Sequence, residues 1–228
     1  MAHACRNVAR TRGGMARTRG NMADSVGIGA MMRRGLLIVV LVGVLSFSAC
    51  HMIQVSTPDP VDSVVMVYNV GGYGSGAIIG PDCVLTARHM TINEGIRVTT
   101  ADGADYEVVR VVQDKDSDLA LLYIDGQFDE VPLVLDPTPL KVGDEVIVIG
   151  TPMGEKALMN CVVTGRVVKV DVETPLPGVD SADMYDVHAG PGFSGGPVLD
   201  NRGRIRGVHT VSVAALGGGV PVGELDVP

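Results

Sequence analysis

The sequence lacks tryptophan altogether, and aromatic residues make up only 4% of its 228 positions. Apolar residues in the body of the chain show no helical periodicity longer than one or two turns. Valine is abundant instead, and 30 glycines and 13 prolines supply many turns. Because β-branched residues favour strands while glycine and proline favour turns, the composition predicts an all-β protein of short strands rather than a helical bundle.

Basic residues are scarce outside the N-terminal segment. The first fifty residues hold seven of the 18 basic side chains but only one acid, Asp24. Residues 51–228 therefore carry 11 basic and 25 acidic side chains, a net charge of −14. A body this acidic repels phosphate backbones, so we do not expect nucleic-acid binding.

Cysteine is also rare, with only Cys5, Cys50, Cys83 and Cys161 in the chain. They form no CxxC pair and no spacing typical of a zinc site, so we expect neither a metal nor another cofactor. Cys83 and Cys161 lie in apolar, strand-like runs. There they either form one disulfide in an oxidising compartment or stay as buried thiols.

The longest apolar run is too short to span a membrane. Arg33 and Arg34 precede the apolar or small residues 35–47, and small residues continue up to Cys50. A membrane helix needs about 20 apolar residues, whereas this pattern describes a secretory signal. The end of the run also resembles a bacterial lipobox, with Phe47 in place of the usual leucine. We predict lipidation at Cys50, and the alternative is an ordinary signal peptide with an incidental cysteine.

A short basic repeat precedes this signal, because Ala9–Gly13 recurs as Ala16–Gly20. We interpret it as translation assigned from too early a start, with Met31 or Met32 the true first residue. An arginine-rich transit peptide is the alternative.

From residue 61 onward, short β-rich runs alternate with Gly, Asp and Pro. About a dozen runs at this spacing indicate a β-sandwich or barrel. The expected strands are Val64–Val70, Ser75–Ile79, Cys83–Thr86, Ile96–Thr100, Tyr106–Val112, Leu119–Ile124, Glu145–Ile149, Cys161–Val170, Met184–Val187, Pro197–Leu199, Arg204–Thr210 and Val220–Val222. A proline-containing segment divides them, so we expect a leader (1–50), a tether (51–60), an N-terminal half (61–133), a linker (134–141) and a C-terminal half (142–228).

The stretch Gly190–Pro197 places Ser194 among glycines. Glycines permit positive φ and a close approach of substrate, and consecutive N–H groups in such a turn can stabilise an oxyanion. A serine nucleophile also needs a base that an acid orients. His89 ends one strand-like run and Asp118 precedes another. Taken singly, each residue also fits an ordinary turn or surface position.

Five segments together resemble the trypsin-like (chymotrypsin-fold) serine endopeptidases, nearest the bacterial HtrA/Deg-type and glutamyl-endopeptidase branches. The resemblance covers essentially all of residues 61–228, and the order His, Asp, Ser is the one this fold uses. The segments are Gly74–Ile79, Leu85–His89, Asp118–Leu122, Ile149–Gly154 and Gly192–Pro197.

The resemblance implies an all-β fold of two antiparallel six-stranded barrels, with the active site in the cleft between them. The barrel formed by residues 61–133 would carry His89 and Asp118, and the barrel formed by residues 142–228 would carry Ser194.

The resemblance also implies the roles of these residues. His89 would be the general base, Asp118 would orient it, and Ser194 would attack to form an acyl-enzyme. The N–H groups of Gly192 and Ser194 would form the oxyanion hole. Asp114 and Asp116 are rivals for the orienting acid, but only Asp118 directly precedes the Leu-Ala-Leu-Leu strand.

In this family the primary substrate pocket is lined by the segment before the nucleophile and by the strand after it, which here supply His188 and His209. His209 matches the histidine that glutamyl endopeptidases place against an acidic P1 side chain, where it can neutralise a carboxylate. HtrA-type members carry other polar residues there, so His209 either selects an acidic P1 residue or only packs on the pocket wall. Residues from Thr210 to Ser212 would pair with the substrate backbone as an added strand.

Phe193 departs from the family pattern, which usually has Asp or Asn before the nucleophile. In the trypsin group that Asp pairs with a newly cut N-terminus, so zymogen activation of that type is not expected here. An inactive or weakly active trypsin-like fold that acts as a binding or surface protein is therefore the alternative to an enzyme. Because the chain ends at Pro228, no PDZ domain is expected.

The expected partners are protein or peptide substrates. We expect an exported protein on the periplasmic or cell-surface side of a bacterial membrane, with membrane contact only through the lipid at Cys50. The sequence predicts no oligomeric state.

Overall fold

The computed structural model describes residues 59–176 and 178–226. The predicted leader, the lipidation site Cys50 and most of the predicted tether lie outside these residues. No helix in the described ranges is long and apolar enough to cross a membrane.

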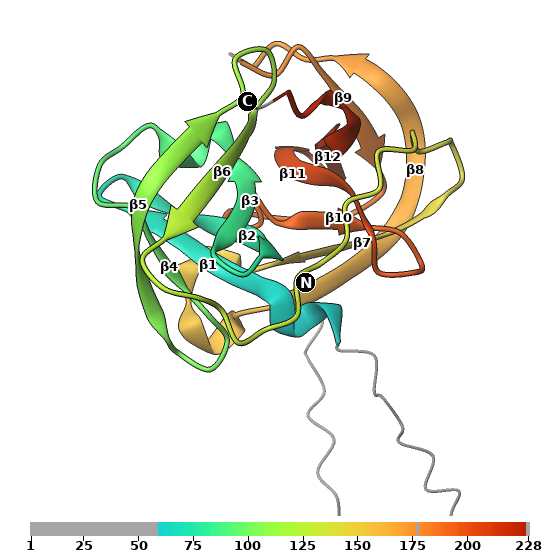
Figure 1. Cartoon of the computed structure of the whole chain (residues 1–228). Coiled ribbons are helices and arrows are strands. Elements are labelled where there is room, and N and C mark those ends of the chain that lie inside the picture. The colour runs from blue at the N-terminus through green and yellow to red at the C-terminus, as the bar shows by residue number, and fades with distance from the viewer. Residues whose placement is uncertain (1–58, 177, 227–228) are drawn as a thin grey trace, which may run out of the picture. The chain divides into compact units, whose positions relative to one another are not determined.

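The first half of the described chain forms a closed antiparallel barrel of six strands in the order β1-β2-β3-β6-β5-β4 (Figure 1). Four of the six pairings join consecutive strands, and the β3–β6 and β1–β4 pairings close the barrel. The strands are β1 (Val64–Asn69), β2 (Gly72–Gly80), β3 (Cys83–Ala87), β4 (Arg97–Thr99), β5 (Asp105–Gln113) and β6 (Leu119–Ile124).

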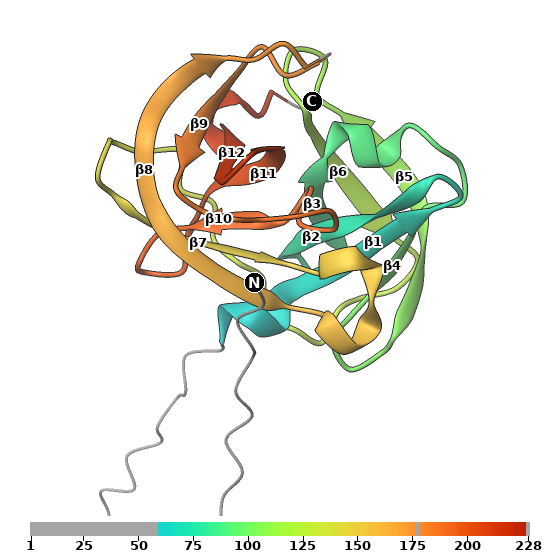
Figure 2. The same cartoon turned by 180° about the vertical axis from the view of Figure 1, so that it is seen from behind.

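The second half forms another closed barrel, in the order β10-β11-β12-β9-β8-β7 (Figure 2). Its long strand β8 bends around one side of the barrel in this view. The strands are β7 (Glu145–Gly150), β8 (Cys161–Glu173), β9 (Ser181–Tyr185), β10 (Pro197–Leu199), β11 (Ile205–Val213) and β12 (Leu216–Pro221).

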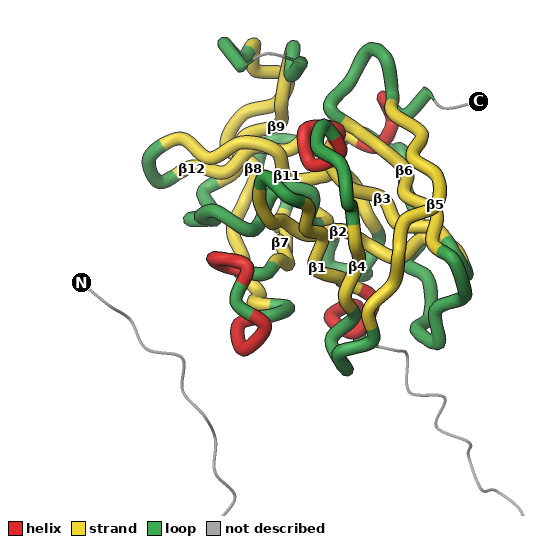
Figure 3. Tube along the Cα trace, turned by 90° about the vertical axis from the view of Figure 1, so that its left-hand side faces the viewer, coloured by secondary structure: helices red, strands yellow, loops and turns green. Residues whose placement is uncertain are grey.

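Strands and loops make up almost all of the described chain, as Figure 3 shows. The helices among the described residues are short 3-10 turns at strand ends. They are η1 (Pro60–Ser63), η2 (Arg88–Thr91), η3 (Pro152–Gly154), η4 (Lys156–Leu158) and η5 (Val222–Glu224). The predicted all-β fold of two six-stranded barrels is therefore confirmed.

The apolar runs of the sequence form the interiors of the barrels. β3 is buried along its whole length, and β6 is buried except at Tyr123. β5 and β8, whose side chains are more polar, alternate between exposed and half-buried positions because only one face of each strand meets a core. No disulfide joins Cys83 of β3 to Cys161 of β8.

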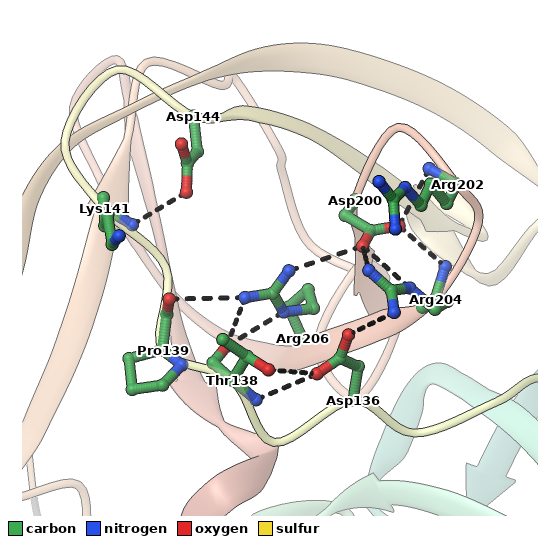
Figure 4. Close-up of polar contacts among 9 residues, drawn as sticks. All are labelled: Asp136, Thr138, Pro139, Lys141, Asp144, Asp200, Arg202, Arg204 and Arg206. Atoms are coloured by element: carbon green, nitrogen blue, oxygen red, sulfur yellow. Dashed lines mark hydrogen bonds and ion pairs between the residues drawn. The ribbon is translucent and has the colours of Figure 1, made fainter.

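The segment between the barrels is held by two arginines of the β10–β11 hairpin region (Figure 4). Arg204 contacts Asp136 at 2.7 Å and Asp200 at 2.9 Å. Arg206 contacts Asp200 at 3.3 Å and donates to the carbonyl of Thr138. These bonds fix the connecting segment to the strand pair that follows Ser194.

The twelve predicted strands all occur, and Leu119–Ile124 and Pro197–Leu199 have the predicted bounds. β9 begins at Ser181 rather than Met184, because Ser181 and the next residue also pair with β8. β12 begins at Leu216 rather than Val220, because three consecutive glycines there pair with neighbouring strands. Glycine has low β propensity, so pattern reasoning did not extend the strand through them.

Candidate functional site

His89 and Asp118 lie side by side because their strands pair. His89 follows β3 in η2, Asp118 directly precedes β6, and Ala87 lies opposite Leu119. His89 Nδ1 is 2.7 Å from Asp118 Oδ2, and the backbone N–H of His89 donates to Oδ1 at 2.9 Å. The Asp118 side chain is 3% exposed and that of His89 is 38% exposed. The carboxylate therefore holds the ring with Nδ1–H toward Asp118, which leaves the Nε2 lone pair to accept a proton.

The two rival aspartates have other surroundings. Asp116 is exposed and contacts Lys115 at 3.2 Å. Asp114 is fully buried, and its carboxylate accepts N–H groups from Asp116, Ser117 and Asp226. Burial alone would raise the pKa of Asp114, but these three N–H groups hold it below its ordinary value. Asp114 thus shapes the loop that leads to Asp118 and does not contact His89.

Arg88, the neighbour of His89, joins this loop to the second barrel. Its guanidinium donates to the carbonyls of Asp114 at 2.8 Å and Lys115 at 3.1 Å. It also donates to the carbonyl of Gly178, in the β8–β9 connection, at 3.1 Å. Sequence reasoning assigned no role to Arg88, because nothing local indicates that its partners are distant carbonyls.

Ser194 follows a tight turn over Gly190–Phe193. The Phe193 N–H donates to the Gly190 carbonyl at 3.2 Å, Pro191 occupies the second position, and Gly192 has φ of +102°. This is the pattern of a type II turn, which requires positive φ at the third position. A Cβ on Gly192 would lie 2.1 Å from the Thr151 carbonyl oxygen, so only glycine fits.

The hydrogen bonds of this segment leave two N–H groups without an acceptor. Between Pro191 and Gly196, the N–H groups of Phe193, Gly195 and Gly196 all donate to carbonyls. Among the described residues, no acceptor is bonded to the N–H of Gly192 or Ser194.

Both of these N–H groups have fixed directions. The Pro191 carbonyl accepts from Met153 N–H at 2.9 Å, and the Phe193 carbonyl accepts from Gly196 N–H at 2.9 Å. The N–H and C=O of a trans peptide point in opposite directions. The N–H of Gly192 therefore points away from Met153, and the N–H of Ser194 points away from the N–H of Gly196. Two N–H donors that are oriented in this way, and have no acceptor among the described residues, can stabilise a developing oxyanion.

Phe193 is anchored in the interior of the second barrel. It is 3% exposed and belongs to an apolar cluster that includes Val148, Val187 and Val198. A Cβ on Gly150 would lie 2.7 Å from its ring, so the ring fills the space that this glycine leaves. Burial of a phenylalanine stabilises by roughly 2–3 kcal/mol. Hydrophobic packing thus fixes the turn at the point where the family usually carries an acid or amide.

Residues 74–208, which contain both strand ends and the turn, match the family model of the trypsin-like peptidase domain. The chain belongs to this family. It is also similar to proteins described as probable DegP-like periplasmic serine endoproteases. The protein from Chlamydia pneumoniae is 34% identical over 154 residues, which cover 66% of this chain and 31% of that protein. The protein from Rickettsia prowazekii is 32% identical over 156 residues, which cover 66% and 30%. The chain thus spans about a third of the length of these relatives.

Solved structures show the same fold. The Rv3671c protease in an inactive form matches with a TM-score of 0.61 and 28% identity, over 72% of this chain and 86% of that one. A serine-to-alanine mutant of Rv3671c from M. tuberculosis H37Rv, also an inactive form, matches with a TM-score of 0.60 and 27% identity, over 72% and 83%.

In this trypsin-like peptidase domain, His209 lies within a directed chain of hydrogen bonds. The Ser212 hydroxyl donates to the Ala189 carbonyl at 2.6 Å, so its oxygen accepts from His209 Nε2–H at 3.1 Å. A neutral imidazole carries one N–H, so Nδ1 accepts from the Tyr185 hydroxyl at 2.6 Å. This series of hydrogen bonds therefore runs from the Tyr185 hydroxyl through His209 and Ser212 to the carbonyl of Ala189.

His209 is neutral in this arrangement. It is 1% exposed. Burial, with a smaller contribution from the charge of His89, lowers its pKa from 6.5 to about 4. The protonated form is therefore strongly disfavoured, and of the two ways in which His209 could meet a substrate carboxylate, hydrogen bonding remains.

The other residues expected to bind substrate lie in different environments. His188 is exposed. Thr210 is 8% exposed, and its hydroxyl oxygen has no hydrogen-bond partner among the described residues. Ser212 is exposed at the end of the His209 chain. Thus the structure joins Ser212 to His209, whereas exposed His188 directly precedes Ala189, whose carbonyl ends the chain.

Ser194 lies on the second barrel, whereas His89 and Asp118 lie on the first. Among the described residues, the Ser194 hydroxyl has no hydrogen bond, to His89 or to another group. Catalytic hydrogen bonds in free enzymes are often long and tighten only with substrate. The Ser194 carbonyl does accept the N–H of Ser75 at 2.7 Å, which ties the nucleophile segment to the first barrel.

Sequence reasoning assigned no role to Ser75 or Tyr185. Ser75 lies in the Gly-Ser-Gly segment that carried part of the resemblance, and its small neighbours were the available signal. Tyr185 is fully buried, and a tyrosine in an apolar run needs a hydroxyl partner, which is the signal that was present. In the described ranges, no group of His, Cys, Asp and Glu side chains could hold a metal ion.

Proposed function

We propose that the protein is a serine endopeptidase that uses His89, Asp118 and Ser194 as a catalytic triad. The observation that carries the proposal is the pair of N–H groups at Gly192 and Ser194 that have no partner among the described residues. One of them belongs to Ser194 itself, the proposed nucleophile. The 2.7 Å contact between His89 and Asp118 supplies the oriented base that such a serine needs.

The reaction proceeds through an acyl-enzyme. His89 Nε2 takes the proton of Ser194 Oγ as the oxygen attacks the scissile carbonyl carbon. The oxyanion of the tetrahedral intermediate accepts hydrogen bonds from Gly192 and Ser194, each contributing roughly 3–4 kcal/mol. His89 then gives its proton to the leaving amine, and a water activated by the same nitrogen hydrolyses the ester. Asp118 stabilises the imidazolium formed in both steps.

The alternative is an inactive or weakly active binding protein. It was suggested by Phe193, whose ring could distort the oxyanion turn. The ring instead lies in the core of the second barrel, and the turn retains two unbonded N–H groups. These observations favour an enzyme over a binding protein.

Labelling with a fluorophosphonate tests the triad. We expect the full chain to be labelled and to cleave casein, and the Ser194→Ala variant to do neither. Ser117→Ala, which removes another buried serine hydroxyl of the same chain, serves as the matched control and should still label. A folded wild type that is not labelled would support the binding protein.

A finer proposal is that the enzyme prefers an acidic P1 residue. It is supported by the Tyr185–His209–Ser212 chain, which ends in an exposed hydroxyl. By rotating from the Ala189 carbonyl to a substrate carboxylate, Ser212 would donate to the substrate while His209 still donates to Ser212. Recognition would then rest on hydrogen bonds, because His209 is neutral.

Profiling with a peptide library tests this preference. We expect enrichment of Glu or Asp at P1 and its loss in Ser212→Ala, with cleavage of other peptides retained. A wild-type profile without acidic P1 residues would leave His209 as a residue of the pocket wall.

We also propose export and a lipid anchor at Cys50. The signal-like sequence supports export, as do the periplasmic names of the relatives from Chlamydia and Rickettsia. In bacteria expressing the full chain, labelled palmitate should enter the wild type and not Cys50→Ala, with Cys83→Ala as the control. Palmitate that persists in Cys50→Ala would rule out this anchor.

A further inference from the structure

Ser75 of β2 connects the first barrel to the nucleophile turn of the second. The residue is fully buried. Its hydroxyl donates to the Gly192 carbonyl at 2.7 Å and accepts from the Thr151 N–H at 2.9 Å. Its own N–H donates to the Ser194 carbonyl at 2.7 Å. Three of its hydrogen bonds therefore cross between the barrels.

The two carbonyls that Ser75 holds lie in the peptides that directly follow Gly192 and Ser194, the residues whose N–H groups are the proposed oxyanion donors. We propose that Ser75 is a positioning residue, which holds the backbone at Gly192 and Ser194 so that both N–H groups face the reacting carbonyl. The proposal rests on the proposed function, because it concerns the same reaction. Ser75 does not contact the substrate in this role and acts through the turn.

The hydroxyl of Ser75 lies between two groups that share only a long hydrogen bond of their own. The Thr151 N–H is 3.4 Å from the Gly192 carbonyl oxygen, in addition to its shorter bond to Ser75. Without the hydroxyl, the buried Gly192 carbonyl would keep only this long contact. The peptide after Gly192 would then rotate toward Thr151. Because Gly192 is packed against the Thr151 carbonyl, the turn has no room to shift as a rigid unit.

Ser75 also links the turn to the strand that leads to His89. The hydroxyl of Thr86, three residues before His89, donates to the Ser75 carbonyl at 2.8 Å. A Cβ on Gly195 would lie 2.1 Å from that same carbonyl oxygen, so the turn packs directly on this bond. One residue therefore connects the nucleophile turn, the oxyanion donors and the strand of the base.

Kinetics of Ser75→Ala in the full chain test the proposal. The substrate is a quenched-fluorescent peptide chosen from the library profile, and the inhibitor is the aldehyde of the same sequence, which forms a tetrahedral adduct. Loss of one true oxyanion donor costs about 100- to 1,000-fold in kcat, so loss of a positioning bond should cost roughly 10- to 100-fold. KM should change by less than about twofold, and the aldehyde should bind more weakly by the same factor as kcat falls.

Ser63→Ala is the matched control. Ser63 is also a buried serine in the first barrel, and its hydroxyl donates to the Val131 carbonyl away from the turn. The Ser63→Ala variant should lose stability to an extent similar to Ser75→Ala, and it should keep the wild-type kcat and affinity for the aldehyde. If Ser75→Ala does not fold, Ser75→Cys retains a weaker donor at the position and should show the same pattern at smaller size.

The outcomes separate this proposal from the proposed function. Selective loss of kcat and aldehyde affinity in the Ser75 variants, with Ser63→Ala intact, supports the positioning role. A folded Ser75→Ala or Ser75→Cys with wild-type kcat and aldehyde affinity overturns it and leaves the protease proposal standing. A wild type that neither labels with fluorophosphonate nor cleaves peptides overturns both.

Discussion

His89 and His209 are two histidines of one domain that the structure places in opposite environments. Each forms a hydrogen bond through Nδ1, but the partner of His89 is the carboxylate of Asp118 and that of His209 is the hydroxyl of Tyr185. The side chain of His89 is 38% exposed, whereas His209 is 1% exposed. A carboxylate stabilises an imidazolium, and a buried hydroxyl does not.

In the proposed mechanism, this difference leaves proton transfer to His89 alone. A proton taken by His89 remains beside the negative charge of Asp118. A proton on His209 would lie in an apolar cluster against Phe193, without an acid to pair with it. The charge of His89 also lowers the pKa of His209, so the two rings are not expected to be charged together. In the proposed reaction, neutral His209 would therefore not repel the imidazolium of His89.

The largest expected effect comes from removing the acid that distinguishes the two rings. Asp118→Asn should lower kcat by roughly 10⁴-fold with little change in KM, because the amide favours the wrong tautomer and does not stabilise imidazolium. Steady-state hydrolysis of a library-derived peptide measures it. The control Asp116→Asn, two residues away and exposed, should change kcat by less than about twofold. A loss of less than tenfold in Asp118→Asn would mean that another group orients His89.

The second effect concerns the pH dependence of stability that burial imposes on His209. Its pKa is about 4 when folded, against 6.5 for an ordinary histidine, so folding favours the neutral ring. The corresponding stabilisation is fully present above about pH 6.5 and is lost as the pH falls toward 4, a change of roughly 3 kcal/mol.

Urea denaturation of the wild type and His209→Gln between pH 7.5 and 4 measures this change. Burial raises the pKa of Asp183 and Glu224, which acts in the opposite direction, so the difference between the two proteins isolates His209. The advantage of the wild type should shrink by about 3 kcal/mol as the pH falls through this window. An advantage that stays constant would show that His209 titrates normally.

The sequence predicted best those residues that lie at the ends of apolar strands. β3 and β6 are apolar runs with clear ends, so His89 and Asp118 could each be placed at a strand end, and the structure adds that the two strands pair. β12 was placed too late because Gly217, Gly218 and Gly219 pair through their backbones, and pairing of this kind leaves no side-chain pattern. Periodicity predicts strands whose side chains pack and misses those defined by backbone bonds alone.

The features of the site that the sequence did not predict depend on contacts between distant segments. Ser75 and Gly192 are separated by 117 positions, and only the closing of both barrels brings them together. The same holds for the charge of His209, which the sequence left open as either a protonated or a hydrogen-bonding group beside an acidic substrate. Its neutrality depends on burial and on the nearby charge of His89, neither of which a single strand sequence specifies.

The smallest expected effect comes from removing the hydroxyl that holds His209. Tyr185→Phe keeps the buried ring but leaves His209 Nδ1 without a donor, which should lower the free energy of unfolding by about 1–2 kcal/mol. The proposed mechanism gives His209 no part in proton transfer. We therefore expect kcat on peptides without an acidic P1 residue to stay within about threefold of the wild type. That change corresponds to a difference in activation free energy well below 1.4 kcal/mol. Urea denaturation and steady-state hydrolysis measure the two quantities on one sample. Tyr73→Phe, at a partly exposed tyrosine of β2, should change neither. A collapse of kcat in Tyr185→Phe, at intact folding, would mean that the Tyr185–His209 chain participates in the reaction and that the two histidines are not separate in function.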